Sequence, residues 1–282
     1  MASLIKTTQE IKSILSESNR PIGFVPTMGA LHAGHVSLIK TAREECKTVV
    51  VSIFVNPLQF GPSEDLKRYP RDLEGDLKIC KDNNVDLVFA PDEKEIYPTD
   101  VSKTEIIEPP KKLTIILCAK TRPIFFQGIA TVVNKLFNII KPDISYWGEK
   151  DLQQLHVIGW LVKEFKLPIV VKACPIIRES NSLACSSRNR YLTDGQKVVA
   201  VNIYKSLQLA KQNMRSGFFT VHKAVLESIV FLAQFSEIKV EYFEARDKEN
   251  LAIVDENKTH GFYFFIAARV DGVRLIDNIE IA

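Results

Sequence analysis

Two histidines stand three positions apart, directly after the first strongly apolar run of the sequence. Residues 26–35 read Pro-Thr-Met-Gly-Ala-Leu-His-Ala-Gly-His, so that His32 and His35 enclose Gly34. At the start of a helix, histidines at this spacing can point to one side and donate hydrogen bonds to a phosphate whose charge grows in a transition state. Backbone N–H groups and the dipole at a helix start favour the same ligand. The pattern therefore predicts a phosphate-binding turn.

Two other interpretations of these histidines remain open. Either residue can cap the following helix or pack in the core without meeting a ligand. A zinc site is disfavoured, because a zinc-binding helix motif needs histidines at i and i+4 and a further ligand, and neither is evident.

The cysteines are odd in number, widely spaced and never paired as Cys-x-x-Cys, so we expect reduced structural thiols. They are Cys46, Cys80, Cys118, Cys174 and Cys185.

Two cations elsewhere in the chain have the chemistry to hold phosphate groups. Lys150, in a Gly-Glu-Lys-Asp segment, offers a point charge, and Arg188, in a Ser-Ser-Arg-Asn segment, offers a planar fork of donors. A solvated surface position is the alternative for each charge. Ser186 and Ser187, which precede Arg188, can be turn residues that cap the local backbone.

The elements that must position these residues alternate between strand-like and helix-like patterns. A first helix is expected after Thr7, since Thr7 and Glu10 make a capping-box signal. Strands are then expected near residues 22–25, 49–55, 85–90, 144–147 and 169–173, and helices near residues 34–46, 73–81, 129–140 and 152–164. This repeated β-α-β order predicts an α/β fold with a Rossmann-like, doubly wound parallel sheet. Ligands of such sheets bind beyond the carboxyl ends of the strands, where the histidines and Lys150 stand.

A different pattern begins at about residue 177. Two helices are expected near residues 194–214 and 220–235, followed by strands near 237–245, 262–270 and 273–276. The pair Asp271-Gly272 between the last two runs is a strong hairpin signal. We therefore predict a catalytic domain over residues 1–176 and a smaller α+β domain over residues 177–282.

The bulk composition is that of an ordinary globular protein. Of the 282 residues, 46% are hydrophobic, and 37 Lys and Arg nearly balance 34 Asp and Glu, for a net charge of +3. This charge is too small and too evenly spread to predict a nucleic-acid or membrane partner. No apolar run reaches the ~18 residues of a membrane span, and no signal-peptide core is evident, so a cytoplasmic protein is expected.

The histidine segment resembles a known family signature. Residues 26–35 are similar to the His-x-Gly-His motif of the nucleotidylyltransferase superfamily, in the form typical of pantothenate synthetases. Further segments match that family in order and spacing, and the similarity extends over nearly the whole chain. They are residues 52–60, 68–71, 148–154 and 186–193.

The resemblance implies a carbon–nitrogen ligase of coenzyme A biosynthesis, an AMP-forming pantoate–β-alanine ligase. Such an enzyme adenylates pantoate with ATP, releases pyrophosphate, and then transfers the pantoyl group to β-alanine with release of AMP. Because pantoate already carries the attacking carboxylate, the protein has to supply positioning and positive charge rather than a nucleophile or base. The residues to which the resemblance gives catalytic roles are His32, His35, Lys150 and Arg188.

The same resemblance implies which residues bind the substrates. The expected ATP-binding residues are Met28, His35, Gly148, Lys150, Asp151, Ser186, Ser187 and Arg188, with both serines in a mobile phosphate-binding loop. The expected pantoate-binding residues are Gln59, Gln154 and Asn56, for which surface or turn positions are the alternatives. Asp151 would accept hydrogen bonds from the ribose hydroxyls, or cap the helix that follows it.

Mg²⁺ is implied because ATP is a substrate, and Asp76 is the candidate ligand. A homodimer is expected from the resemblance alone. The smaller domain is expected to act as a lid and to be associated with dimerisation.

One position departs from the family pattern in a way that bears on function. Where many members have Arg-Pro-x-His-Phe, this chain has Arg122 followed by Phe125 at the histidine position. A phenyl ring cannot donate a hydrogen bond, so altered use of β-alanine is expected. The alternative is that Phe125 only packs against Phe126 and Phe137. Just upstream, Leu-Cys-Ala at residues 117–119 replaces a segment that usually ends in Gly.

Two other functions remain as alternatives. Another adenylyl-transferring enzyme of the same fold would explain the histidines and the serine loop, but not the Val-Asn-Pro-Leu-Gln-Phe segment or Gln154. A non-catalytic nucleotide sensor is suggested by Phe125, and it would bind ATP without releasing pyrophosphate. A dinucleotide oxidoreductase is disfavoured, because the first strand-helix turn lacks Gly-x-Gly-x-x-Gly.

Overall fold

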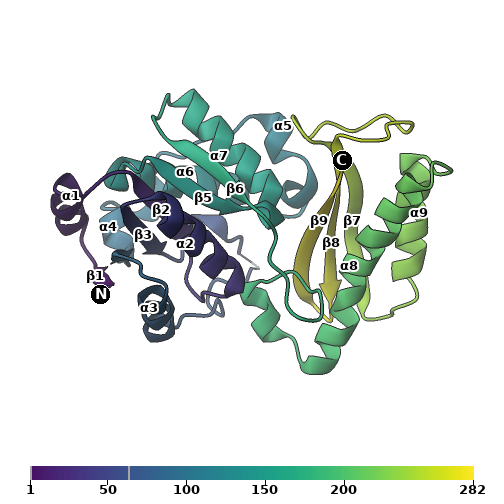
Figure 1. The fold of residues 1–282 in the computed structure, drawn as a ribbon, viewed down its shortest axis with the longest axis horizontal. Helices are drawn as coiled ribbons and strands as arrows, with labels where there is room; N and C mark the ends of the chain where they lie inside the picture. Colours follow the sequence, from purple (N-terminus) through teal and green to yellow (C-terminus); the bar gives the residue numbers. More distant parts are fainter. Residues whose placement is uncertain (1, 63) are drawn as a thin grey trace. The chain divides into compact units, whose positions relative to one another are not determined.

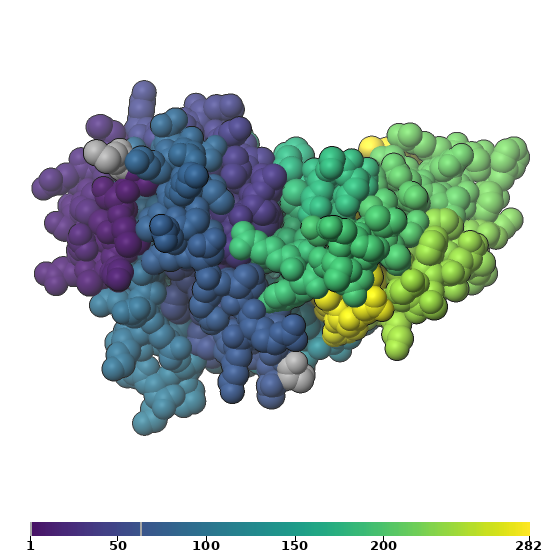
Figure 2. Space-filling view, turned by 90° about the horizontal axis from the view of Figure 1, so that it is seen from below, coloured from purple at the N-terminus to yellow at the C-terminus, as the bar shows by residue number. Residues whose placement is uncertain are grey.

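The structure, a computed structural model, describes residues 2–62 and 64–282. The chain divides into two compact units (Figure 1). The first comprises Met1–Ile115 and Ala119–Pro175, and the second comprises Ile116–Cys118 and Ile176–Ala282. Apart from the segment Ile116–Cys118, the units follow the order of the chain, so the green-to-yellow atoms in the space-filling view belong to the second unit (Figure 2).

The first unit is built on a parallel sheet, with the strand order β1-β4-β3-β2-β5-β6 among the described residues. The strands are β1 (Ser3–Ile5), β2 (Ile22–Thr27), β3 (Thr48–Ile53), β4 (Leu87–Phe89), β5 (Ile144–Gly148) and β6 (Val170–Cys174). From β2 the chain proceeds outward to β3 and β4, and it then continues with β5 on the other side of β2. This order confirms the predicted doubly wound α/β sheet.

Helices of the first unit connect these strands. They are α1 (Thr8–Ser16), α2 (Ala33–Glu45), α3 (Leu73–Asp82), α4 (Glu93–Ile96), α5 (Lys111–Thr114), α6 (Phe125–Ile140) and α7 (Leu152–Glu164). Short 3₁₀ turns lie at η1 (Pro57–Gln59), η2 (Val101–Lys103), η3 (Leu117–Lys120) and η4 (Glu149–Asp151). Across residues 2–62 and 64–282, none of the helices combines the length and apolar character that crossing a membrane requires.

The central strands of the sheet are buried on both faces, as their continuous apolar sequences predict. On one face, Val49 and Val51 of β3 pack with Ile39 of α2 in one buried cluster. Successive side chains of a strand point to opposite faces, so the residues between these valines face the other side of the sheet. There the ring of Phe24 of β2 meets that of Phe137 of α6 edge-to-face, with centroids 6.2 Å apart. The sheet is therefore fixed between α2 and α6, which steadies the ends of its central strands.

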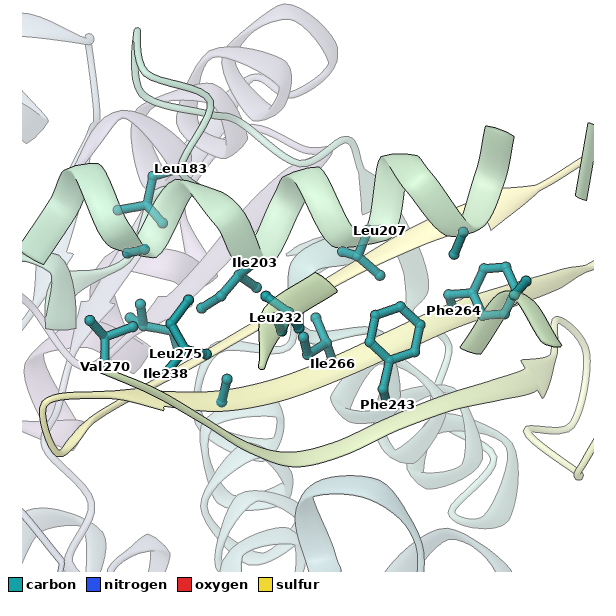
Figure 3. Close-up of a cluster of buried hydrophobic side chains, with 14 of the residues drawn as sticks. Leu183, Ile203, Leu207, Leu232, Ile238, Phe243, Phe264, Ile266, Val270 and Leu275 are labelled. Carbon is teal, nitrogen blue, oxygen red and sulfur yellow. The ribbon is translucent and has the colours of Figure 1, made fainter. Parts of the chain in front are cut away.

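The second unit is the predicted smaller α+β fold. Its elements are η5 (Ser187–Tyr191), α8 (Asp194–Arg215), α9 (Val221–Leu232), β7 (Ile238–Asp247), β8 (Phe262–Val270) and β9 (Val273–Ile281), and the strands are antiparallel in the order β7-β8-β9. Ile203 and Leu207 of α8 lie in one buried cluster with Phe264 and Ile266 of β8 (Figure 3). The predicted hairpin turn at Asp271-Gly272 is confirmed, with φ of 45° and 89°.

The segment Ile116–Cys118 is joined to the second unit through a sulfur atom. Cys118 is buried, and its Sγ lies 3.2 Å from the hydroxyl of Tyr242. The guanidinium of Arg274 donates to the same sulfur at 3.6 Å. All five cysteines, Cys118 among them, are buried and free of disulfides.

Candidate active site

The predicted site residues of the first unit follow three neighbouring strands. β2 lies between β3 and β5, with Thr27 opposite Ile53 and Phe24 opposite Ser145. Thr27 and Gly148 end β2 and β5, each three residues beyond the pair Phe24 and Ser145, so the two strands end at the same level. The winding of the sheet reverses between β2 and β5. Ligands of doubly wound sheets bind at such a point, and the predicted residues lie around it.

The two histidines form the N-terminal cap of α2. Nδ1 of His32 accepts a hydrogen bond from Gly34 N–H at 3.2 Å, and Nδ1 of His35 accepts one from His32 N–H at 3.3 Å. The ring centroids are 4.1 Å apart. A neutral imidazole that accepts through Nδ1 carries its proton on Nε2, so these contacts fix the tautomer of each ring. The capping interpretation is confirmed, and donation by these rings to a phosphate stays a prediction.

A buried aspartate shapes the turn before the histidines. Asp76 of α3 is 2% exposed, and its two carboxylate oxygens accept hydrogen bonds from Ala30 N–H at 2.8 Å and Leu31 N–H at 2.7 Å. Gly29 and Ala30 have φ of 79° and 52°, in the left-handed region. A Cβ on Gly29 would also lie 2.9 Å from Oδ2 of Asp76, so the turn requires glycine there.

This arrangement bears on the magnesium ligand predicted at Asp76. Within residues 2–62 and 64–282, no group of three or more His, Cys, Asp or Glu side chains is arranged to hold a metal ion. Both oxygens of Asp76 already hold backbone N–H groups. Protein-bound Mg²⁺ usually keeps several waters and uses few carboxylates together with substrate phosphates. The role of Asp76 as a Mg²⁺ ligand stays a prediction.

Lys150 lies in η4, directly after β5, and forms an ion pair that the sequence did not predict. Its Nζ is 3.2 Å from Oδ2 of Asp151, with side-chain exposures of 18% and 38%. Partly exposed pairs of this kind are weak, so the ammonium can also turn to a phosphate. Asp151 occupies the N-cap position of α7, but its side chain makes no capping hydrogen bond. A Cβ on Gly148 would meet no heavy atom within 4 Å, so a ligand can approach this backbone closely.

The amide of Asn56 has a protein partner for each hydrogen bond that it can make. Nδ2 donates to Gly128 O and to Oε1 of Gln59, both at 3.0 Å. Oδ1 accepts from Tyr97 OH at 2.7 Å and from Leu58 N–H at 3.3 Å. The side chain is 0% exposed. Asn56 therefore supports the amide of Gln59, and its direct contact with pantoate stays a prediction.

The two glutamines predicted to bind pantoate are held differently. Gln59 ends η1 and is 7% exposed, and its Oε1 accepts from Asn56, which leaves the N–H groups of Nε2 for other partners. Gln154 lies half-buried in the first turn of α7, and its amide has no partner among the residues that the structure describes. Its neighbour Gln153 is buried and donates to Leu113 O at 2.8 Å. Gln154, and not Gln153, thus keeps its amide available.

Phe125, the departure from the family pattern, starts α6 and packs on a cation. The Cζ atom of Arg122 lies 3.5 Å from the centroid of its ring. The ring also meets Phe126 edge-to-face, with centroids 5.1 Å apart, so this part of the packing alternative is confirmed. The ring of Phe137 meets Phe24 instead.

The guanidinium of Arg122, on which Phe125 packs, is held within the first unit. Arg122 is 8% exposed, and its Nε lies 3.0 Å from both carboxylate oxygens of Glu64. Its Nη2 lies 2.5 Å from Glu64 and donates to the main-chain oxygen of Gln59 at 3.1 Å. Phe125 therefore acts, through Arg122, on the turn that carries Gln59.

The remaining predicted residues divide between the two units. Met28 is half-buried and directly follows β2 in the first unit. In the second unit, Oγ of Ser186 accepts from Arg188 N–H at 3.3 Å and caps η5, which confirms its turn role. Ser187 is buried, and Arg188 is half-buried. The amide of Asn189 donates to Glu179 at 2.6 Å and to a main-chain oxygen at 3.0 Å, so it fixes the shape of this turn.

Sequence reasoning missed Tyr97 and Gly128. A Cβ on Gly128 would lie 2.2 Å from Leu58 O, so α6 can approach η1 only because this residue is glycine. An isolated glycine within an apolar helical pattern is a signal for such close approach. Tyr97 carries no local signal, because its partner Asn56 lies 41 positions away.

Comparisons with known proteins draw on the whole chain. The family model described as pantoate-beta-alanine ligase matches residues 3–280. A pantothenate synthetase of Thermotoga petrophila is 44% identical over 278 residues, which cover 98% of each chain. A bifunctional pantoate ligase/cytidylate kinase of Thermosynechococcus vestitus is 44% identical over 91% of this chain but only 50% of its own length. This chain therefore spans about half the length of that bifunctional relative.

Solved structures agree with these matches. The pantothenate synthetase of Thermus thermophilus superposes with a TM-score of 0.94 at 38% identity, covering 99% of each chain. The pantoate-beta-alanine ligase of Francisella tularensis, complexed with beta-gamma ATP and beta-alanine, gives a TM-score of 0.83 at 36% identity, covering 99% of this chain and 98% of that one. By sequence and by fold, this chain belongs to the pantoate–β-alanine ligase family of enzymes.

Proposed function

We propose that the protein condenses pantoate with β-alanine, using ATP, through a pantoyl adenylate. The observation that carries this proposal is the histidine cap that follows β2, in which Nδ1 of His32 and Nδ1 of His35 each accept a main-chain hydrogen bond. The neighbouring strand β5 leads directly to Lys150. Support for the substrates comes from the Francisella tularensis relative, whose structure is described as a complex with beta-gamma ATP and beta-alanine.

In the first step, a carboxylate oxygen of pantoate attacks the α-phosphorus of ATP. The new O–P bond forms while the bond from this phosphorus to the bridging oxygen breaks, and pyrophosphate leaves with the electron pair. No general base is needed, because the carboxylate is already ionised near neutral pH. His32, His35 and Lys150 donate to phosphate oxygens, where preorganised donors stabilise the charge that develops in the transition state.

In the second step, the neutral amine of β-alanine attacks the acyl carbon of the adenylate. A C–N bond forms, the C–O bond to AMP breaks, and the nitrogen releases a proton. In this proposal, Arg188 holds phosphate groups together with Ser186 and Ser187. The role is supported by the turn that brings these residues together, in which Oγ of Ser186 accepts from Arg188 N–H.

The remaining polar residues bind the substrates. Gln59 and Gln154 donate to oxygens of pantoate, and Asn56 supports Gln59 by donating to its Oε1. Asp151 accepts from the ribose, a role that fits its lack of a capping hydrogen bond. Mg²⁺ enters as the MgATP substrate. The homodimer and the lid role of residues 177–282 rest on the family resemblance.

Pyrophosphate release tests the proposal directly. The protein should release pyrophosphate from MgATP only with pantoate, and should release AMP and pantothenate when β-alanine is added. Lys150→Ala should lower turnover by ~10²-fold, as expected for removal of one preorganised charge. Lys172→Ala is the matched control, because this lysine also lies after an apolar stretch but pairs with Glu45. ATP binding without pyrophosphate release would instead identify a nucleotide sensor.

A further inference from the structure

The side chain of Asn56 can be placed in only one orientation. Its amide lies between two main-chain groups of opposite polarity, the carbonyl oxygen of Gly128 and the N–H of Leu58. A carbonyl oxygen can only accept a hydrogen bond, and a main-chain N–H can only donate one. Nδ2 must therefore face Gly128, and Oδ1 must face Leu58.

The hydroxyl of Tyr97 completes this arrangement from the other side. It lies 2.7 Å from Oδ1 of Asn56, so the hydroxyl is the donor. Tyr97 is 2% exposed, and burial, followed by the negative charge of Glu93, raises the pKa of its phenol well above the usual value. The hydroxyl thus keeps its proton over the whole working pH range and remains a donor to Asn56.

The remaining hydrogen of Asn56 fixes the amide of Gln59. Nδ2 has two hydrogens, of which one goes to Gly128 O and the other to Gln59, each across 3.0 Å. Because Nδ2 can only donate, the atom of Gln59 that faces it must be the oxygen. Gln59 therefore turns its Nε2, with two N–H groups, to any ligand. Its main-chain oxygen is held separately by Arg122 at 3.1 Å.

We propose that Tyr97 is a positioning residue that acts through Asn56 to make Gln59 a donor-only contact. Gln59 then selects a substrate oxygen that accepts hydrogen bonds, either a carboxylate or a hydroxyl oxygen, and rejects an ammonium at the same place. This inference rests on the proposed function, in which Gln59 binds pantoate. It adds to that function a positioning residue, Tyr97, and a polarity rule, namely that the substrate group facing Gln59 must accept hydrogen bonds.

Tyr97→Phe is the smallest change that interrupts this path. The ring stays, and only the hydroxyl that donates to Oδ1 of Asn56 is lost. We expect the KM for pantoate to rise roughly two- to tenfold, the range that corresponds to loss of one neutral hydrogen bond. The KM for ATP and kcat should stay within about twofold, because neither depends on the Gln59 amide. As a control, Tyr146→Phe removes another buried hydroxyl, one that donates to Glu45 at 2.9 Å, and should leave the pantoate KM unchanged.

A double-mutant cycle separates positioning from a purely structural role. In a Gln59→Ala background, Tyr97→Phe should cause no further rise in the pantoate KM, because both changes interrupt one path. Pantoate-dependent thermal stabilisation gives the same comparison for a variant that turns over too slowly. If the effect of Tyr97→Phe is undiminished in that background, Tyr97 only supports the fold and the proposal is overturned.

The polarity rule has its own test. Gln59→Glu keeps an oxygen facing Asn56 but offers a second oxygen in place of the N–H groups. This variant should lose pantoate affinity and gain relative affinity for pantoate analogues in which a hydroxyl is replaced by an ammonium. Unchanged preference between pantoate and every such analogue would overturn the rule. A wild-type protein without pantoate-dependent pyrophosphate release would overturn the proposed function as well, whereas an active enzyme with a normal pantoate KM in Tyr97→Phe would overturn this inference alone.

Discussion

The two turns proposed to bind phosphate are shaped by different kinds of buried group. In the first unit, the carboxylate of Asp76 accepts two main-chain N–H bonds from the turn before the histidines. In the second unit, the neutral amide of Asn189 donates to Glu179 and to Ala184 O, while its Oδ1 has no partner within the described residues. Hydrogen bonds to an ionised group are about twice as strong as neutral ones. Both bonds of Asp76 are of the stronger kind, whereas only the bond to Glu179 is among the two of Asn189. The first turn should therefore depend more heavily on its one side chain than the second turn does.

The largest effect is expected from Asp76→Asn. The new amide can accept from only one of the N–H groups of Ala30 and Leu31, and its own NH₂ would face the other. The free energy of unfolding should fall by about 2–4 kcal/mol, and turnover should fall as the histidine turn shifts. Urea unfolding checks the first result. Asp72→Asn, at the N-cap of the same helix, should change stability by less than about 0.5 kcal/mol, because both residues cap well.

The same variant also tests the other role suggested for Asp76. If this carboxylate binds Mg²⁺ instead, Asp76→Asn should raise the Mg²⁺ concentration needed for activity while leaving the unfolding free energy nearly unchanged. That outcome would reverse the comparison between the two turns.

Asn189→Ala should have the next largest effect. It removes two hydrogen bonds and leaves the buried oxygen of Ala184 without its donor. Stability should fall by about 1–3 kcal/mol, the range for one unsatisfied buried group. Differential scanning calorimetry can compare this loss with that of Asp76→Asn. A larger loss for Asn189→Ala would show that a neutral amide braces its turn more strongly than the carboxylate braces the other.

Phe125 supports a third turn, η1 with Gln59, by packing its aromatic face on Arg122. Phe125→Leu removes a cation–π contact worth about 0.5–2 kcal/mol. Because Arg122 holds the main chain of Gln59, we expect the pantoate KM to rise a few-fold while β-alanine kinetics stay normal. The sequence led us to expect that the missing histidine alters the use of β-alanine, and on that expectation Phe125→His should improve it. Measuring both half-reactions in the two variants distinguishes these expectations.

The smallest effect, a gain in stability, is expected from Ser182→Gly. Ser182 lies in the turn that precedes the serine loop, with φ of 77°, a conformation that costs a residue with a side chain about 1–2 kcal/mol. Allowing for the greater freedom of an unfolded glycine, the net gain should be about 0.5–1 kcal/mol in urea unfolding. Ala30→Gly, at φ of 52° in the first turn, should gain nothing, because it also gives up a buried methyl group worth about 0.8 kcal/mol. Equal gains at both positions would contradict this reasoning.

The elements with long apolar runs could be predicted from the sequence, and the short ones could not. The run at residues 49–55 predicted β3 because few other structures accommodate so many buried β-branched residues. β1 was missed, because three residues are too few to show an alternation. The start of α6 was placed near residue 129, four residues late, because Ile124 occupies the N-cap without a capping side chain to mark it.

The site shows the same limit in a different form. The histidine turn could be predicted, since its chemistry depends on residues within one helical turn. The roles of Asp76 and Asn56 could not, because their partners Ala30 and Gly128 lie 46 and 72 positions away. Spacing within a motif shows which side chains can reach a ligand, but only the fold shows which of them are already occupied.

The segment Ile116–Cys118 has a consequence for how such a protein can evolve. The chain passes between the units after Ile115, after Cys118 and after Pro175, so no single peptide bond separates them. A stretch of DNA encoding only residues 176–282 would specify a second unit without the sulfur that contacts Tyr242 and Arg274, both of which are largely shielded from water. Recombination that exchanges the second unit between relatives therefore also has to supply a compatible residue at position 118, which is encoded within the stretch for the first unit. We expect the two units to be inherited together for this reason.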